Sequence, residues 1–140
     1  MAAFNKIQDY VDQLNRAVHN WASHTFKSLL TNAAPVATNT IAANLTDIAA
    51  GNGYSAGGMT LDTVTLSETT GTAKVTIADE VLTASGAIGP FRYVAIYNDT
   101  ATSPADALVC WYDYGSSIAL ANGETFTLDF DATNGLWQMV

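Results

Sequence analysis

Charged side chains are scarce in this chain of 140 residues, because Asp, Glu, Lys and Arg together make up only 13% of it. That is about half the share found in an ordinary globular protein. Disordered chains combine high charge with low hydrophobicity, whereas 49% of this chain is hydrophobic, so a folded protein is expected. The few charges are mostly acidic and give a net charge of −8 at pH 7. Such a surface repels a phosphate backbone, and direct nucleic-acid binding is therefore not expected.

Cysteine is almost absent, and long apolar runs are absent altogether. The single cysteine, Cys110, cannot form an internal disulfide, so the fold needs no oxidising compartment. It lies in the apolar run 107–112, where a buried thiol is expected rather than a reactive one. No run reaches the length of a membrane span, and the first residues lack the apolar core of a signal peptide. The sequence thus predicts a soluble protein made in a cytoplasm, without membrane contact.

Catalytic and zinc-binding patterns are incomplete. Residues 53–57 read Gly-Tyr-Ser-Ala-Gly and match the G-x-S-x-G pattern of serine hydrolases. That pattern requires a strand-to-helix elbow and a histidine downstream of the serine, but the next segment alternates like a strand and both histidines lie upstream. We interpret residues 53–57 as a turn. The two histidines, His19 and His24, have no neighbouring cysteine, and we expect helix-end or core positions rather than zinc ligation.

The acidic residues are more typical of turns than of a metal site or a catalytic pair. Residues 129–135 resemble the start of a calcium loop, but the glycine comes one position late and Val140 stands where a glutamate should be. Asp79 and Glu80 are adjacent in a predicted strand, so their side chains point to opposite faces and cannot act as a concerted pair. We therefore expect no catalytic residue, no metal site and no cofactor.

The aromatic residues of the second half allow two interpretations. Core packing is favoured, since most aromatic side chains in strands are buried, and a platform for a carbohydrate or another ligand is the alternative. The residues concerned are Phe91, Tyr93, Tyr97, Trp111, Tyr112 and Tyr114.

A helical pattern occurs only near the N-terminus, over residues 4–21. Apolar residues recur there at spacings of three and four, with mostly polar residues between them, which predicts an amphipathic helix in an N-terminal segment of residues 1–21. One interpretation, which we favour, packs this stripe on the sheet of its own domain, and the other makes it a contact with another protein. The stripe supplies the candidate protein-contact residues Phe4, Ile7, Val11, Leu14, Val18 and Trp21.

From residue 22 onward the periodicity is two, which predicts a mainly β domain over residues 22–140 with a β-sandwich or jelly-roll-like fold. Asn122-Gly123 and Asn134-Gly135 fit tight hairpin turns. Residues 91–98 and 107–112 are apolar on both faces, as in central strands that are covered on both sides. The predicted strands are 25–31, 45–49, 61–67, 72–78, 80–84, 91–98, 107–114, 117–121, 124–130 and 136–140. The expected core residues are Val75, Ile77, Val94, Ile96, Phe126, Leu128 and Phe130.

Several short segments, in the same order and with similar gaps, resemble a family of small structural proteins from tailed-bacteriophage virions. The resemblance covers about residues 19–140, whereas the first eighteen residues are the least characteristic. The individual segments carry no chemistry of their own, so it is their collinearity that makes the resemblance. They are His19-Asn20 and residues 30–35, 48–58, 89–93, 97–100, 111–117 and 123–126.

This resemblance implies a β-sandwich virion protein of the capsid decoration (cement) or head-tail type, made in the cytoplasm of a host bacterium and located in the virion. The first expectation is a decoration protein that binds and stabilises the assembled shell. The implied partners are the major capsid protein or other virion proteins, and a homo-oligomer is expected. A tail, neck or fibre component that contacts other virion proteins or the host surface is the second expectation. A polysaccharide-degrading virion enzyme is the third.

Overall fold

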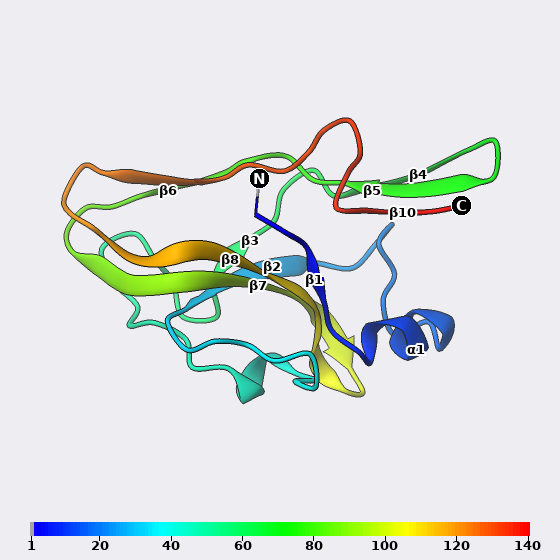
Figure 1. The fold of residues 1–140 in the computed structure, drawn as a ribbon, viewed down its shortest axis with the longest axis horizontal. Helices are drawn as coiled ribbons and strands as arrows, with labels where there is room; N and C mark the ends of the chain where they lie inside the picture. The colour runs from blue at the N-terminus through cyan, green and yellow to red at the C-terminus, as the bar shows by residue number, and fades with distance from the viewer. Residues whose placement is uncertain (1) are drawn as a thin grey trace.

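The computed structural model describes residues 2–140 and confirms a mainly β fold with antiparallel sheets and one short N-terminal helix. Figure 1 shows two layers of strands that face each other, so the chain forms a sandwich. The elements are β1 (Asn5–Lys6), α1 (Tyr10–Asn15), β2 (Phe26–Thr31), η1 (Ala42–Asn44), β3 (Met59–Thr60), β4 (Thr65–Thr69), β5 (Thr72–Thr76), β6 (Glu80–Thr83), β7 (Ile88–Thr102), β8 (Ala105–Leu120), β9 (Thr125–Leu128) and β10 (Trp137–Met139).

The first layer is a five-stranded sheet in the order β1-β8-β7-β2-β3. Its centre is the long antiparallel hairpin of β7 and β8, whose middle residues Ile96, Leu108 and Val109 are fully buried. The second layer covers one face of this sheet. The chain between β2 and β3 crosses the other face (Figure 1), which confirms that β7 and β8 are covered on both sides.

The second layer consists of two small sheets placed end to end: β6 pairs with β9, and β10, β5 and β4 form a three-stranded sheet. Apolar residues from both layers meet in one core, as the alternating pattern predicts. Six of the seven expected core residues are buried, and Phe126 is only half-buried. Phe126 differs because it lines a cavity between the layers, described below.

Residues 32–58, here called the covering segment, are held to the outer face of the first layer by hydrogen bonds. The amide of Ile48 donates to the carbonyl of Leu30 (3.1 Å), and the hydroxyl of Tyr97 donates to the carbonyl of Gly57 (2.6 Å). Buried Tyr54 accepts from the amide of Leu30 (3.0 Å) and donates to the carboxylate of Asp47. The predicted strand 45–49 is therefore wrong, because these residues bond to β2 singly and to side chains instead of forming a ladder.

Both predicted hairpin turns exist, but neither joins paired strands. The amide of Glu124 donates to the carbonyl of Ala121 (3.0 Å) around Gly123, and the amide of Gly135 donates to the carbonyl of Asp131 (2.7 Å). The first turn carries the chain from β8 in one layer to β9 in the other, and β10 after the second turn pairs with β5. The predicted hairpins are wrong because turn residues determine the local backbone conformation but not which strand the following strand pairs with. The predicted break between 107–114 and 117–121 is also wrong, since β8 continues through Gly115.

The predicted N-terminal helix is much shorter than residues 1–21. Met1 lies outside the described residues, Asn5 and Lys6 pair with β8 as strand β1, and only Tyr10–Asn15 is helical. The helix ends in a two-bond turn, in which the amide of Val18 donates to the carbonyl of Gln13 (2.9 Å) and that of Ala17 to Leu14 (3.2 Å). Ala17 takes the left-handed position of this motif, with φ of 59°. The apolar spacing of three and four thus arises from a strand, a short helix and a loop.

Candidate functional site

The six candidate contact residues do not form one surface. Ile7 and Trp21 are buried in the domain's own core, and Leu14 and Val18 are half-buried. Only Phe4 and Val11 are exposed, at 36% and 46%. Packing on the chain's own domain, the favoured interpretation, is confirmed for Ile7 and Trp21. These two residues cannot contact a partner in this fold.

The two histidines lie in a buried polar network at the end of β7, as the core interpretation predicts. His19 is buried and its Nε2 donates to Gln13 (2.9 Å), while the amide nitrogen of Asn98 lies 3.3 Å from Nδ1 of His19 and 3.0 Å from Nδ1 of His24. Burial, with a smaller effect from His24, lowers the pKa of His19 to about 4. Within residues 2–140, no three side chains of His, Cys, Asp or Glu are grouped to hold a metal ion.

The G-x-S-x-G segment is a turn, as predicted. Ser55 is exposed, and Gly51 and Tyr54 bond to each other across the turn. Gly53 has a positive φ, and a Cβ there would lie 2.5 Å from the carbonyl oxygen of Thr83. The glycines of this segment therefore serve close packing of the backbone.

The acidic residues singled out in the sequence accept hydrogen bonds from backbone amides and so hold loop segments in place. The carboxylate of Asp79 accepts from the amide of Phe130 (2.8 Å), and that of Glu80 accepts from the amide of Asp62 (2.7 Å), so the two point to different partners. Asp131 accepts from the amides of Thr133 and Asn134, both at 2.8 Å, and forms the turn expected for residues 129–135. Cys110 is fully buried, as predicted, and burial raises the pKa of its thiol.

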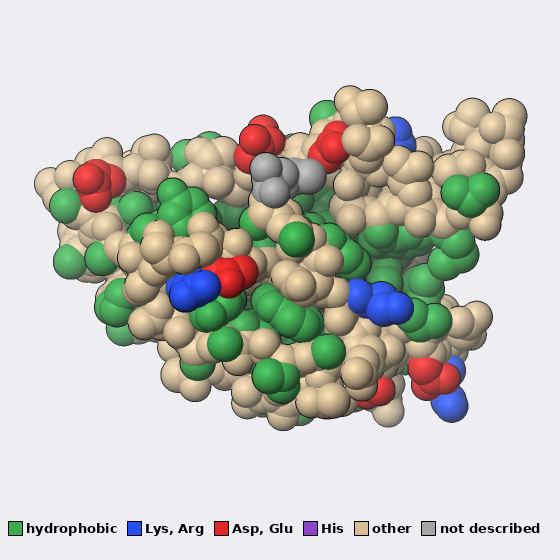
Figure 2. All heavy atoms as spheres, in the orientation of Figure 1, with side chains coloured by type: hydrophobic (Ala, Val, Ile, Leu, Met, Phe, Trp, Pro, Cys, Tyr) green, Lys and Arg blue, Asp and Glu red, His purple; other side chains and the backbone are tan. Residues whose placement is uncertain are grey.

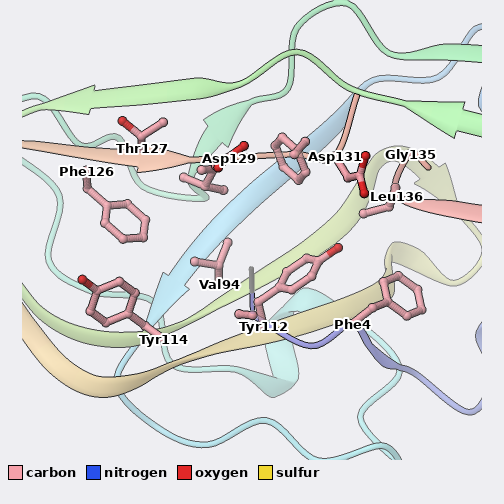
Figure 3. A pocket seen from close by; sticks show the side chains of 13 residues that line it. Phe4, Val94, Tyr112, Tyr114, Phe126, Thr127, Asp129, Asp131, Gly135 and Leu136 are labelled. Atoms are coloured by element: carbon pink, nitrogen blue, oxygen red, sulfur yellow. The ribbon is translucent and has the colours of Figure 1, made fainter. Parts of the chain in front are cut away.

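A cavity of about 250 Å³ opens between the two layers, over β7 and β8 and under β9 and the turn that follows it. Figure 3 shows the side chains around it, with Phe4 and Tyr112 toward one end and Tyr114 and Phe126 toward the other. The sequence identified Val94, Phe126, Leu128 and Phe130 as core residues but gave no sign that they leave this space open. The lining residues are Ala2, Phe4, Val94, Tyr112, Tyr114, Phe126, Thr127, Leu128, Asp129, Phe130, Asp131, Gly135 and Leu136.

Aromatic rings meet at steep angles in this cavity. Phe4 and Tyr112 are 6.1 Å apart with planes at 71°, and Tyr114 and Phe126 are 5.9 Å apart at 70°. The hydroxyl of Tyr112 is hydrogen-bonded to the thiol of Cys110, whereas that of Tyr114 has no hydrogen-bond partner among the described residues. Burial raises the pKa of Tyr112. The cavity thus offers ring faces, ring edges and the free hydroxyl group of Tyr114.

Asp129 and Asp131 are the only charged residues that line the cavity within residues 2–140. The backbone amide of Asn134 donates to Asp131 and its side chain adds a second bond, which together hold the pKa of Asp131 below its usual range. Asp131 therefore stays negatively charged. It is a poor general acid, because the general acid of a glycosidase is a carboxylic acid whose pKa is raised. The cavity suits a neutral or cationic molecule better than an anion.

A second surface feature lies on the three-stranded sheet. Directly opposed residues share a face, and the pairings place Leu66, Val75 and Trp137 in one row with Glu68, Ala73 and Met139 in the next. The five apolar residues of these two rows are here called the apolar face, and Glu68 lies at its edge. Its inner part is covered, since Val75 is fully buried and Trp137 packs edge-on against Trp21 at 6.4 Å. Its outer part is not, since Leu66 and Met139 are 42% and 52% exposed, and Figure 2 shows hydrophobic side chains gathered in the hollow beside α1.

Comparison of the chain with protein-family models, with curated proteins and with solved structures found no match in any of the three. Across residues 2–140, none of the helices has the length and apolar character that crossing a membrane requires.

Proposed function

We propose that this chain is a structural protein of a tailed-bacteriophage virion, and that it decorates and stabilises the assembled capsid shell. The proposal starts from the seven collinear segments that resemble such proteins. These segments have structural roles in the fold. Residues 48–58 belong to the covering segment, which Tyr54 and Gly57 hold to the first layer, and Asn98 joins both histidines. A set of shared residues that shapes a fold and forms no reactive site is typical of a structural protein.

The observation that carries the proposal is the outer part of the apolar face, where Leu66 and Met139 are left uncovered at one end of the molecule. A cement protein stabilises a shell by mass action, which requires a surface that binds the assembled state. Burying two large apolar side chains contributes to such binding, and the scarcity of charged residues lowers the desolvation cost of the contact. This face replaces the N-terminal stripe as the candidate contact with the major capsid protein.

A tail, neck or fibre position would use the same kind of surface, and the copy number in the particle separates it from shell decoration. The enzyme alternative gains no support from the cavity, because Asp131 is engaged in its own turn. The location is tested by cryo-electron microscopy of virions made with and without the chain. Density repeated over the shell that disappears in virions without the chain is the expected result. Density confined to one vertex would contradict decoration and favour the neck or tail.

The contact surface is tested by replacing Leu66 and Met139 with serine. We expect the purified double variant to fold with an unchanged circular dichroism spectrum but to bind shells that lack the chain more weakly. Gln138→Ala is the matched control, because Gln138 is exposed on the opposite face of the same strand as Met139. Full shell binding by the folded double variant would rule out this face as the contact.

A further inference from the structure

The aromatic cavity has walls and charges that match one class of small molecule. Five aromatic residues line it (Phe4, Tyr112, Tyr114, Phe126 and Phe130). Ring faces carry negative electrostatic potential and attract cations, and quaternary ammonium groups are recognised by cages of such rings. The steep angles within the pairs Phe4–Tyr112 and Tyr114–Phe126 give the cavity walls on more than one side, as a cage requires.

The charges around the cavity favour the same class. Asp129 and Asp131 lie on the second-layer side (Figure 3), and no Lys, Arg or His is among the lining residues. Lys74 is close enough to Asp131 to affect its pKa, but its amine donates to the carbonyl of Thr133 (2.9 Å). The carboxylate oxygens of Asp131 are already bound within its turn, whereas the exposed carboxylate of Asp129 forms no hydrogen bond in the described residues. Asp129 is therefore the acid free to face a cation.

The size of the cavity is also suitable. At about 250 Å³ it is larger than the engineered protein cavity of roughly 150 Å³ that binds benzene. It is open rather than sealed, because Tyr114 is 56% exposed and Phe4 stands partly exposed at its edge. A compact ion can therefore enter without unfolding of the core.

We propose that this cavity binds a small alkylated ammonium ion of about the size of choline, with the aromatic rings around its methyl groups and Asp129 opposite its charge. This site is separate from the apolar face, and its occupation does not depend on a role in a virion.

The test is a titration of the full chain with choline, followed by nuclear magnetic resonance, with 3,3-dimethylbutan-1-ol as the uncharged analogue of the same shape. We expect choline to shift the signals of Phe126, Tyr114 and Leu136, and to bind about tenfold more tightly than the neutral analogue. Equal affinities for the two compounds would mean a merely apolar cavity and overturn the proposal. So would an unchanged spectrum at millimolar choline.

Two variants locate the site. Asp129→Asn should weaken choline binding several-fold and leave the neutral analogue unaffected, whereas Asp106→Asn removes the same charge at the start of β8, away from the cavity lining, and should change neither. Tyr114→Leu should weaken choline binding more than binding of the neutral analogue, and its folding is checked in the same spectra. Choline affinity that is unchanged in both Asp129→Asn and Tyr114→Leu would place the ion elsewhere and overturn the proposal.

Discussion

The indole of Trp21 lies flat on the ring of Phe26, with the ring centres 3.7 Å apart and the planes within 1° of parallel. This stack joins the loop after α1 to strand β2 of the large sheet. Trp21 also donates a hydrogen bond from Nε1 to the hydroxyl of Tyr10 (2.9 Å), so its ring is packed and its one polar atom has a partner. Tyr10 faces both Trp21 and Trp137, but only Trp21 makes a hydrogen bond of standard geometry, and the buried Nε1 of Trp137 has no acceptor.

This difference predicts unequal effects of the same substitution at the two tryptophans. Trp21→Phe should lower the free energy of unfolding by about 1–3 kcal/mol more than Trp137→Phe, because it leaves the hydroxyl of buried Tyr10 without its donor. Trp137→Phe removes a polar group that has no partner and serves as the matched control. Urea denaturation of both variants measures the difference, and equal losses would contradict the hydrogen-bond argument.

The His19 network predicts that stability falls in mild acid. The pKa of His19 is about 4 in the folded protein and about 6.5 in the unfolded chain. Between these two pH values the unfolded chain binds a proton that the folded protein does not bind. The contribution of neutral His19 to stability is therefore complete above pH 6.5 and is lost as the pH falls toward 4. The loss approaches about 2–3 kcal/mol at the lower end.

The measurement is a series of urea denaturations from pH 7.5 to 4.5, with a nuclear magnetic resonance titration of the imidazole signals. His19→Gln should flatten the pH dependence above pH 5, where carboxylates such as Asp113, whose pKa is lowered by Arg92, do not yet contribute. A His19 signal that titrates near pH 6.5 in the folded protein would contradict this prediction.

Ala17 at the end of α1 should be better replaced by glycine. Its left-handed backbone, with φ of 59°, crowds Cβ against the backbone, whereas glycine adopts this conformation freely. Ala17→Gly should raise the free energy of unfolding by about 0.5–1 kcal/mol. The control Ala22→Gly changes an exposed alanine without a positive φ and should lower stability slightly. Thermal denaturation should show a higher melting temperature for Ala17→Gly and a slightly lower one for Ala22→Gly than for the unchanged protein.

Gly58 should tolerate no side chain at all. A Cβ there would lie 2.1 Å from the carbonyl oxygen of Ser28, and φ is +93°. Gly71 has a similar φ of +85° but nothing within 4 Å, so Gly71→Ala measures the backbone strain alone. Gly58→Ala should therefore cost at least about 3 kcal/mol more than Gly71→Ala. Similar melting temperatures for the two variants would show that the covering segment can move away from β2.

Most of the strands and most core residues could be predicted because alternation records which face of a strand is buried. Val75 and Leu128 are examples, and both are buried. The extent of the N-terminal helix could not be predicted, because the buried residue Ile7 directly follows strand β1 and the buried residue Trp21 lies in a loop, and apolar spacing does not distinguish this arrangement from one helix. The cavity was also missed, since a half-buried Phe126 has the same alternating pattern as a buried one.

The pairing of strands sets the order in which the fold can be completed during synthesis. Asn5 in β1 pairs with Trp111, Leu82 in β6 with Phe126, and Val75 in β5 with Trp137. Strands made early thus wait for partners that leave the ribosome many residues later, and contacts of this kind fold slowly. β4 can pair with β5 as soon as both are made, but until β9 and β10 emerge, β6 and the second edge of β5 have no strand to pair with. The growing chain therefore passes through a period in which its unpaired edges must be kept apart from those of other copies.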